Sequence, residues 1–423
     1  MDEVVLDLDR IRAVRVLGRG ALGTVFLVTV TPGPLLSSPL PPLFALKVFD
    51  KRSAAKPQAL RRARWELSLL SRLCTCRYRF GDSHHRHHPF LPSLLGSVET
   101  ADLLAWALPF CSGGDLHALR CSLCPDDEAF SPAAIRFYLS EIVAALSHLH
   151  SLRIAYRDLK PENVLLQSSG HITLADFDLS RHLPSQSSNL PSPPRPPLPP
   201  IPSDRNRRHR RNLARVFSFG TAEEGFKQKS KSARVSPVSR RRASSSSTLH
   251  SGSHGDGERS FSFVGTEEYV APEVVRGDGH GFAVDWWALG ILAYEMAYGR
   301  TPFRGRDRKE TFRNVLTRPP EFPGRRRTDL TDLIERLLVK DPERRLGFGG
   351  GAEEVKAHPF FKGVRWELLP EVSRPPFLVP VVDEEEEVTR ASGEGSNVGF
   401  DVRDYLKGLH QRQEVSSESL AEF

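Results

Sequence analysis

The feature that most restricts the fold of this chain is the order of eight short polar motifs between Gly18 and Arg345. Each motif lies in a segment whose pattern predicts a strand, a helix or a turn, and each is common by itself. Chance supplies one or two such motifs in 423 residues, but not eight in one order. The chain must therefore fold so that residues far apart in sequence meet in one site.

The first motif is glycine-rich. In RVLGRGALGTVFLV, Gly18, Gly20 and Gly23 fit G-x-G-x-x-G. A dinucleotide-binding loop runs from a strand into a helix. Here the glycines precede TVFLVTV, a β-branched apolar run that predicts a second strand. The motif therefore predicts a β-hairpin, either an ordinary one or one whose backbone N–H groups face a phosphate.

Lys47 lies in the apolar strand pattern FALKVFDK, where a buried lysine is costly unless it is paired. Glu66 follows 19 residues later in RRARWELSLLSRL, an amphipathic helical pattern. Each residue alone is more often a surface charge, but their joint position favours an ion pair between strand and helix.

Two further segments contain polar side chains that could bind a metal ion or a phosphate. IAYRDLKPENVLL holds Asp158, Lys160 and Asn163 within six residues. HITLADFDLSRHL ends an apolar run at Asp176, 18 residues after Asp158. Carboxylate and amide oxygens suit magnesium. By itself, the tripeptide Asp-Phe-Asp fits an ordinary turn after a strand equally well.

With APE at 271–273, Asp285 in DWWALGILAYEM and Arg345 in DPERRLG, the ordered set resembles the eukaryotic protein kinase family. We expect Arg345 to pair with Glu273. The resemblance implies an α+β bilobal kinase fold, with a small β-rich lobe and a large α-helical lobe. The expected boundaries are a kinase domain at 1–380, made of lobes at about 9–110 and 111–361, and a C-terminal tail at 381–423.

The resemblance also implies the cofactors ATP and Mg²⁺ and assigns residues to them. For catalysis it assigns Asp158 to the substrate hydroxyl, Lys160 to the transferring phosphoryl group, and the pair Lys47 and Glu66 to the ATP phosphates. The expected magnesium ligands are Asn163 and Asp176. The remaining expected nucleotide contacts are Leu17, Gly18, Arg19, Gly20, Gly23, Val25, Pro109 and Cys111.

YRDLKPEN, DWWALG, AHPFF and RPPFLVP are similar to motifs of the AGC group of serine/threonine kinases. Asp178, in the place of a glycine, and the long insertion before SFVGTEEYVAPE resemble the plant AGC VIII subfamily and its UNICORN-type members. We expect Asp178 to stiffen its segment and to leave magnesium binding intact.

The AGC resemblance implies further sites. Three acidic residues are expected to select protein substrates with arginine upstream of the target: Asp115, Glu162 and Glu295. Ser262 is the expected activation-loop phosphosite, with Arg157 as its contact. Phe400 and Tyr405 are expected in a tail segment that crosses the ATP site. The ending Leu420-Ala-Glu-Phe423 is a degenerate docking motif, which leaves recruitment of an upstream phosphoinositide-dependent kinase open.

The positive charge of the chain is concentrated in one segment. Residues 181–261 hold 16 Lys and Arg against 5 Asp and Glu, a local charge of +11 that leaves −4 for the rest, since the net charge is +7. This segment is rich in Pro and Ser, so we expect a disordered activation-segment insertion at 184–257. Its arginine clusters favour nuclear import over specific nucleic-acid binding. RRRAS, ending at Ser244, matches the expected substrate pattern and predicts autophosphorylation.

The sequence has no apolar run of membrane-spanning length, and MDEVVLDLDRIR is charged from its first residues. We therefore expect a monomeric protein of the cytoplasm and nucleus with reduced cysteines. A structural zinc site among Cys74, Cys76 and the nearby histidines is a less favoured alternative. Two other functions remain open: a catalytically weak kinase-fold scaffold, and a nuclear binding protein acting through the basic insertion.

Overall fold

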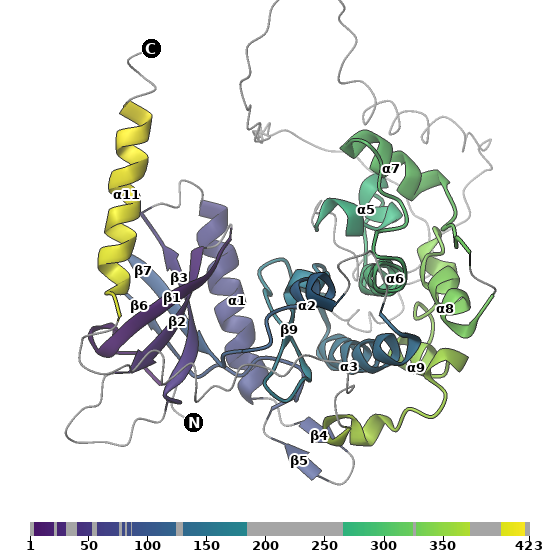
Figure 1. The fold of residues 1–423 in the computed structure, drawn as a ribbon, viewed down its shortest axis with the longest axis horizontal. Helices are drawn as coiled ribbons and strands as arrows, with labels where there is room; N and C mark the ends of the chain where they lie inside the picture. The colour runs from purple at the N-terminus through teal and green to yellow at the C-terminus, as the bar shows by residue number, and fades with distance from the viewer. Residues whose placement is uncertain are drawn as a thin grey trace, which may run out of the picture. The chain divides into compact units, whose positions relative to one another are not determined.

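The computed structural model describes residues 4–20, 23–30, 40–52, 57–75, 78–80, 83–85, 87–123, 130–183, 265–324, 327–372 and 399–418. These residues form a small lobe built on a β-sheet and a large lobe built mainly of helices (Figure 1). The predicted kinase fold is therefore confirmed. The predicted insertion and the residues 381–398 of the tail lie outside the described residues, so their organisation stays a prediction.

The small lobe contains a five-stranded antiparallel sheet. In spatial order its strands are β1 (Ile11–Gly20), β2 (Gly23–Val30), β3 (Leu43–Asp50), β7 (Leu103–Leu108) and β6 (Gly96–Glu99). A short 3-10 helix (Leu8–Arg10) leads into β1, and a small separate hairpin joins β4 (Tyr78–Phe80) to β5 (Ser83–His85).

The two faces of this sheet bury different side chains. Lys47 on β3 pairs with Val25 on β2, so both side chains point to the face that is turned toward the large lobe. Phe26, the next residue of β2, pairs with Leu46 and lies on the opposite, outer face. The register of β2 and β3 thus decides which residues can enter the space between the lobes.

Helix α1 (Pro57–Thr75) packs on the face that is turned toward the large lobe. Its buried apolar residues Ala63, Leu70 and Leu73 recur at helical spacing, and Glu66 lies buried within the same stripe. A carboxylate in an apolar stripe requires a cation nearby, so the packing of α1 itself prepares a site for Lys47.

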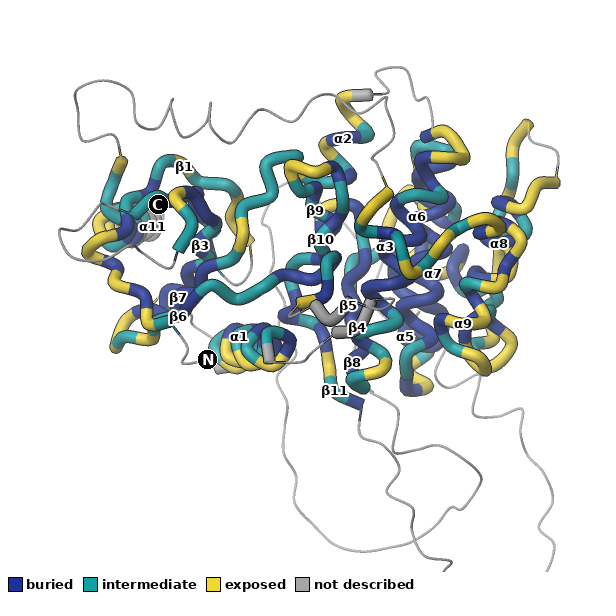
Figure 2. Tube along the Cα trace, turned by 90° about the horizontal axis from the view of Figure 1, so that it is seen from below, coloured by how far each residue is buried: buried dark blue, intermediate teal, exposed yellow. Residues whose placement is uncertain are grey.

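The large lobe is built around α6 (Ala283–Tyr298), which is buried along almost its whole length. The other helices of this lobe are α2 (Leu116–Leu123), α3 (Pro132–Ser151), α5 (Pro272–Arg276), α7 (Arg308–Thr317), α8 (Asp329–Leu337) and α9 (Gly351–Lys356). Short 3-10 turns connect them at Glu267–Tyr269, Pro342–Arg344, Pro359–Phe361 and Trp366–Glu371. Figure 2 shows α6 as a continuous buried stretch.

Two strand pairs and one turn hold the polar residues of the large lobe. β9 (Val164–Leu166) pairs with β10 (Ile172–Leu174), and β8 (Ile154–Ala155) pairs with β11 (Arg181–His182). The 3-10 turn η2 (Pro161–Asn163) enters β9. These pairings bring the segments on either side of Asp158 and Asp176 next to each other.

The C-terminal helix α11 (Val402–Glu418) covers the outer face of the small-lobe sheet, and Figure 1 shows it opposite α1. Phe400 forms an antiparallel bridge with Ala13 on β1. The rings of Phe400 and Tyr405 pack edge-on against Phe26, with centroids 6.1 and 5.4 Å away. The expectation that these aromatic residues cross the ATP site is therefore wrong, because Phe26 and Lys47 lie on opposite faces.

Candidate active site

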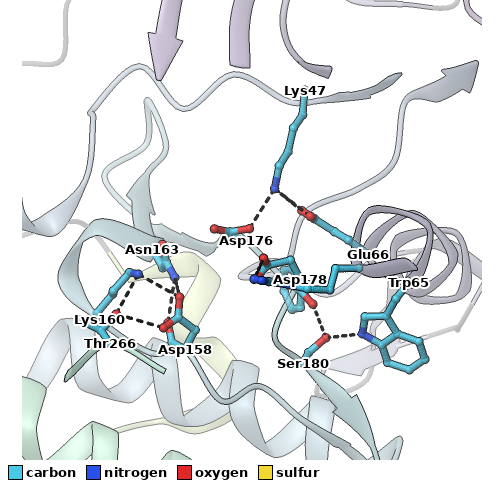
Figure 3. A network of polar contacts seen from close by, with 12 residues as sticks. Lys47, Trp65, Glu66, Asp158, Lys160, Asn163, Asp176, Asp178, Ser180 and Thr266 are labelled. Carbon is cyan, nitrogen blue, oxygen red and sulfur yellow. Dashed lines mark hydrogen bonds and ion pairs between the residues drawn. The ribbon is translucent and has the colours of Figure 1, made fainter. Parts of the chain in front are cut away.

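Lys47 links the small lobe to the start of the 176–180 segment. Its Nζ lies 2.9 and 2.8 Å from the two carboxylate oxygens of Glu66 and 2.9 Å from Oδ1 of Asp176 (Figure 3). Burial lowers the pKa of the Lys47 ammonium, but the two carboxylates outweigh burial and hold this pKa above its usual value. Lys47 is therefore a fixed positive charge, and the pair with Glu66 predicted from the sequence is confirmed.

The loop that carries Asp158 is held by a buried aspartate of α6. Asp285 accepts hydrogen bonds from the backbone N–H groups of Tyr156, at 2.9 Å, and Arg157, at 2.7 Å. His150 Nε2 lies 2.7 Å from the same carboxylate. Arg157 has a φ of 72°, a left-handed conformation that costs energy and persists only when its surroundings hold it. Asp285 thus sets the backbone on which Asp158 stands.

Three side chains converge on the carboxylate of Asp158. Lys160 Nζ lies 3.0 Å from Oδ2, and Asn163 Nδ2 donates to the same oxygen at 2.9 Å. The hydroxyl of Thr266 donates to Oδ1 at 3.2 Å and accepts from Lys160 at 3.0 Å. Figure 3 shows this group beside Asp176. Asp158 is only 6% exposed, so its orientation is fixed by these contacts.

Asp176 stands just after β10 in a strained but accessible position. Its φ is 56°, a left-handed value that aspartate tolerates better than most residues. The backbone N–H of Ala175 donates to the carbonyl oxygen of Asn163 at 2.9 Å, which ties this segment to the Asp158 loop. The Asp176 side chain remains 42% exposed, so it can bind a further ligand.

The expected nucleotide contacts lie in two further regions, the glycine hairpin of the small lobe and the connection between the lobes. Gly20 and Gly23 pair across the hairpin of β1 and β2. Gly23 has a φ of +126°, and a Cβ at this position would lie 2.0 Å from the carbonyl oxygen of Val48, so only glycine fits. A cavity of about 370 Å³ runs from Pro109 and Cys111 to Glu66 and Asp176.

The expected nucleotide residues fall into two groups. The hairpin strands carry Leu17, Gly18, Arg19, Gly20, Gly23 and Val25. Val25 points to the same face as Lys47, whereas the Arg19 side chain hydrogen-bonds the hydroxyl of Tyr405 on α11. Pro109 and Cys111 line the cavity.

Comparisons with known proteins agree with this geometry. The family described as protein kinase domain matches residues 11–193 and 245–361. This chain is a serine/threonine protein kinase of the plant AGC type. It is 52% identical to the Arabidopsis thaliana serine/threonine-protein kinase UCN, over 96% of this chain and 91% of that protein. It is also 52% identical to the kinase UCNL and 41% identical to the kinase OXI1 of the same plant, covering 96% and 98% of this chain and 90% and 88% of those proteins.

The kinase uses ATP, as its family implies. Its APE segment is tied to the rest of the large lobe by a buried ion pair. Arg345 donates to both carboxylate oxygens of Glu273 at 2.7 and 2.9 Å, which confirms the predicted partner. Within the described part of the kinase, no helix is long and apolar enough to cross a membrane. The same residues contain no group of three or more His, Cys, Asp or Glu side chains that could hold a metal ion.

The three expected substrate carboxylates of the kinase lie on neighbouring elements. Asp115 caps α2 by accepting from the backbone N–H of Ala118 at 2.7 Å, and it bridges to Leu165 on β9. Glu295 accepts from the hydroxyl of Tyr269 at 2.6 Å. Burial raises the pKa of Glu295, while the Tyr269 hydrogen bond and the charge of Arg120, 3.9 Å away, oppose the shift. The charge of Glu162 also raises this pKa, so the two carboxylates lie close enough to act on each other.

Cationic groups meet beside the Asp158 loop. Burial and the nearby charge of Arg181 together lower the pKa of Arg157 to about 10, while Asp285 opposes the shift. His280, which is 3% exposed, lies in the same field. Two like charges that act on each other in this way favour the binding of an anion between them. Ser262, the expected phosphosite, lies outside the described residues, as do Ser244, Leu420 and Phe423.

Sequence reasoning missed two contacts of the site. Asp178 has an ordinary negative φ, since the only described non-glycine residues with positive φ are Arg153, Arg157 and Asp176. Its carboxylate instead forms an ion pair with Arg62 of α1. Thr266 belongs to the motif SFVGTEEYVAPE, but the sequence gives no sign that its hydroxyl joins Asp158 to Lys160. The spacing of four residues between Arg62 and Glu66 was the one available signal for the first contact.

Proposed function

We propose that this kinase transfers the ATP γ-phosphoryl group to Ser and Thr residues that follow arginine, with Asp158 orienting the attacking hydroxyl. The observation that carries the proposal is the convergence of Lys160, Asn163 and Thr266 on the Asp158 carboxylate. Phosphoryl transfer requires little covalent chemistry from the protein, so positioning and charge are sufficient. Lys47, held by Glu66, would bind the α- and β-phosphates, and Lys160 would offset charge on the transferring group.

The donor set supports Mg²⁺ as the partner of ATP. Both N–H groups of the Asn163 amide are used by the carbonyl oxygen and the carboxylate of Asp158, at 2.9 Å each, which leaves its carbonyl oxygen as the ligating atom. Asp176 adds a carboxylate, and magnesium prefers such oxygens together with phosphate oxygens and water. When bound, the ion would neutralise phosphate charge and fix the phosphates in line with the hydroxyl held by Asp158.

The catalytic assignment is tested with wild type beside Asp176→Asn in an assay with ATP and Mg²⁺. The Asp176→Asn protein should turn over slower by orders of magnitude while its circular dichroism spectrum stays unchanged. Equal activity of the two proteins would refute the assignment of Asp176. An inactive wild type that still binds partners would instead favour the scaffold alternative, although Lys47, Asp158 and Asp176 are all present.

The negative field of Glu162 and Glu295, with Asp115 at the start of α2, supports a preference for arginine upstream of the target. Carboxylates bind a guanidinium with strong, directional hydrogen bonds. The test is an arginine-rich peptide library with Glu162→Gln and Glu295→Gln. Both variants should lose selectivity for arginine, whereas Glu353→Gln, an exposed acid on α9, should keep it. Preference for an acidic peptide would contradict the assignment.

The cationic pair of Arg157 and Arg181 supports Ser262 as the site of an activating phosphate. A phosphate brings nearly two negative charges and would order the activation loop by pairing with these arginines. Mass spectrometry of active protein should find phosphate at Ser262, added by an upstream phosphoinositide-dependent kinase or by the kinase itself. Fully active protein without phosphate at Ser262 would exclude this switch.

The sequence RRRAS at 240–244 supports autophosphorylation at Ser244, because a tethered substrate has a high effective concentration. The same arginines support nuclear entry, so a fluorescent fusion should be found in both cytoplasm and nucleus, and deletion of 206–242 should deplete the nuclear pool. Incubation with ATP, with Asp176→Asn as control, tests Ser244 directly. If Ser244 stays unmodified while a free arginine-rich peptide in the same tube is phosphorylated, autophosphorylation is excluded, but the preference for arginine-containing substrates is not.

A further inference from the structure

One charged face of α1 contacts the segment that begins at Asp176 at two places. Glu66 holds Lys47, whose ammonium lies 2.9 Å from Asp176. Arg62, one helical turn earlier, forms an ion pair with Asp178. Because residues four apart lie on the same side of a helix, one face of α1 is connected to two alternate residues of the segment.

A neutral contact continues the same line of interactions. The indole Nε1 of Trp65 donates to the hydroxyl oxygen of Ser180 at 3.0 Å, and that hydroxyl donates to the carbonyl oxygen of Phe177 at 2.5 Å (Figure 3). The segment therefore meets α1 at Ser180 as well, through a contact that carries no charge.

The ion pair has unequal partners. The Asp178 side chain is 5% exposed and lies in the negative field of Asp176, whereas the Arg62 side chain is 39% exposed. A buried carboxylate beside a like charge is costly unless a cation compensates for it. Loss of Arg62 therefore removes the ion-pair partner of a buried carboxylate, which then has only the charge of Lys47 to compensate it. Loss of Asp178 leaves only an arginine that can turn to water.

We propose that Arg62 and Asp178 form a positioning pair for phosphoryl transfer, which holds α1 in place so that Glu66 can present Lys47 to Asp176. The pair acts through Lys47 and touches no reacting atom. A glycine at position 178 would give Arg62 no partner, so the aspartate adds a second connection between α1 and the segment. The inference rests on the proposed roles of Lys47 and Asp176.

The test is a double-mutant cycle of Arg62→Ala, Asp178→Ala and the double variant, read as kcat and as KM for ATP and for peptide. Arg62→Ala should lower kcat about 30-fold and Asp178→Ala about threefold, since only the first leaves a buried charge. The double variant should match Asp178→Ala, so that removing the aspartate restores about tenfold. KM for peptide should stay constant in all three.

Two further variants keep the result interpretable. Arg64→Ala removes another arginine of α1, which pairs with Glu99 on β6, and should keep kcat within about twofold of wild type. Arg62→Lys keeps the charge and should recover most of the activity. If Arg62→Ala does not fold, as judged by its thermal melt, Arg62→Gln and Asp178→Asn complete the cycle, and their losses should again fail to multiply.

Losses that multiply in the double variant would overturn the positioning pair, because two coupled residues cannot act independently. An Arg62→Ala protein as active as wild type would do the same. Neither result affects the proposed function, which is tested separately by the expected inactivity of Asp176→Asn in the same assay. Activity of Asp176→Asn would overturn the site itself.

Discussion

Arg345 and Glu273 form a bidentate ion pair in which both side chains are at most 2% exposed. The remaining guanidinium contacts go to backbone carbonyl oxygens, with Nε donating to Val339 at 3.0 Å and Nη1 to Ala283 at 2.8 Å. The pair joins α5, and with it the APE segment, to the residue that follows the 3-10 turn Pro342–Arg344, and the contact with Ala283 extends the connection to the start of α6. Because every guanidinium nitrogen of Arg345 already has a hydrogen-bond partner, the pair stabilises the fold and is not available to bind a ligand.

Replacing Arg345 by alanine should destabilise the large lobe by about 3–5 kcal/mol, because Glu273 is left buried without a cation. Thermal unfolding monitored by circular dichroism measures the loss. Arg344→Ala, which removes an exposed neighbour, is the matched control and should melt within a degree or two of wild type. A melting temperature for Arg345→Ala equal to that of the control would contradict this prediction.

Thr266→Val should lower kcat roughly 10- to 100-fold, because the variant loses hydrogen bonds to charged groups that are worth about 1.5–3 kcal/mol. The hydroxyl of Thr266 connects Asp158 and Lys160, so the effect should fall on kcat and leave KM for ATP unchanged. Thr266→Ser keeps the hydroxyl and should retain most of the activity. Equal kcat values for the valine and serine variants would show that the hydroxyl is not used.

Acid should destabilise the kinase partly through His280. Burial, and then the charges of Arg157 and Arg181, lower the pKa of His280 to about 4, while Glu273 and Asp285 oppose the shift. Between pH 6.5 and about 4 the unfolded chain binds a proton at this position that the folded chain does not. Stability is therefore lost as pH falls through that range, by up to about 3 kcal/mol.

The measurement is the unfolding free energy of wild type and of His280→Gln at several values between pH 4 and pH 7. Subtracting the unfolding free energy of the variant from that of wild type at each pH cancels the contribution of the other titrating groups. The variant should lose less stability on acidification than wild type does. Parallel pH profiles would show that His280 does not contribute.

Leu406→Ala should destabilise the small lobe by about 2–3 kcal/mol, because a leucine that is 5% exposed is removed from the outer face of the sheet. Hydrogen exchange should rise in the peptides of β1 and β2, which α11 covers. Lys407→Ala changes the neighbouring exposed residue and is the control. Unchanged exchange in β1 and β2 would mean that α11 does not protect the sheet.

The sequence was sufficient to predict the kinase fold and the pairs Lys47–Glu66 and Glu273–Arg345. Lys47 lies in an apolar strand pattern and therefore requires a partner, whereas Arg345 was expected to pair with Glu273 because of the resemblance to the protein kinase family. The Arg62–Asp178 pair could not be predicted in the same way. Arg62 is one of several arginines in its helix, and only the docking of α1 on the segment selects it.

For the tail, in contrast, the sequence pattern led to a wrong prediction of where the segment lies. Phe400 and Tyr405 matched a tail motif, but a pair of aromatic residues carries no information about the face on which it lands. The alternation of β2 decides this, because Phe26 points outward and Val25 points toward the large lobe.

The helix α11 also makes the small lobe depend on the order of synthesis. Phe26 and the rest of the outer sheet face leave the ribosome roughly 300 residues or more before Val402 and Leu406, the residues that cover them. At about 5–20 residues per second, this face stays uncovered for roughly 15–60 s. During that interval an apolar surface is open to chaperones and to other nascent chains, so the yield of folded kinase in the cell depends on its last helix as well as on its catalytic core.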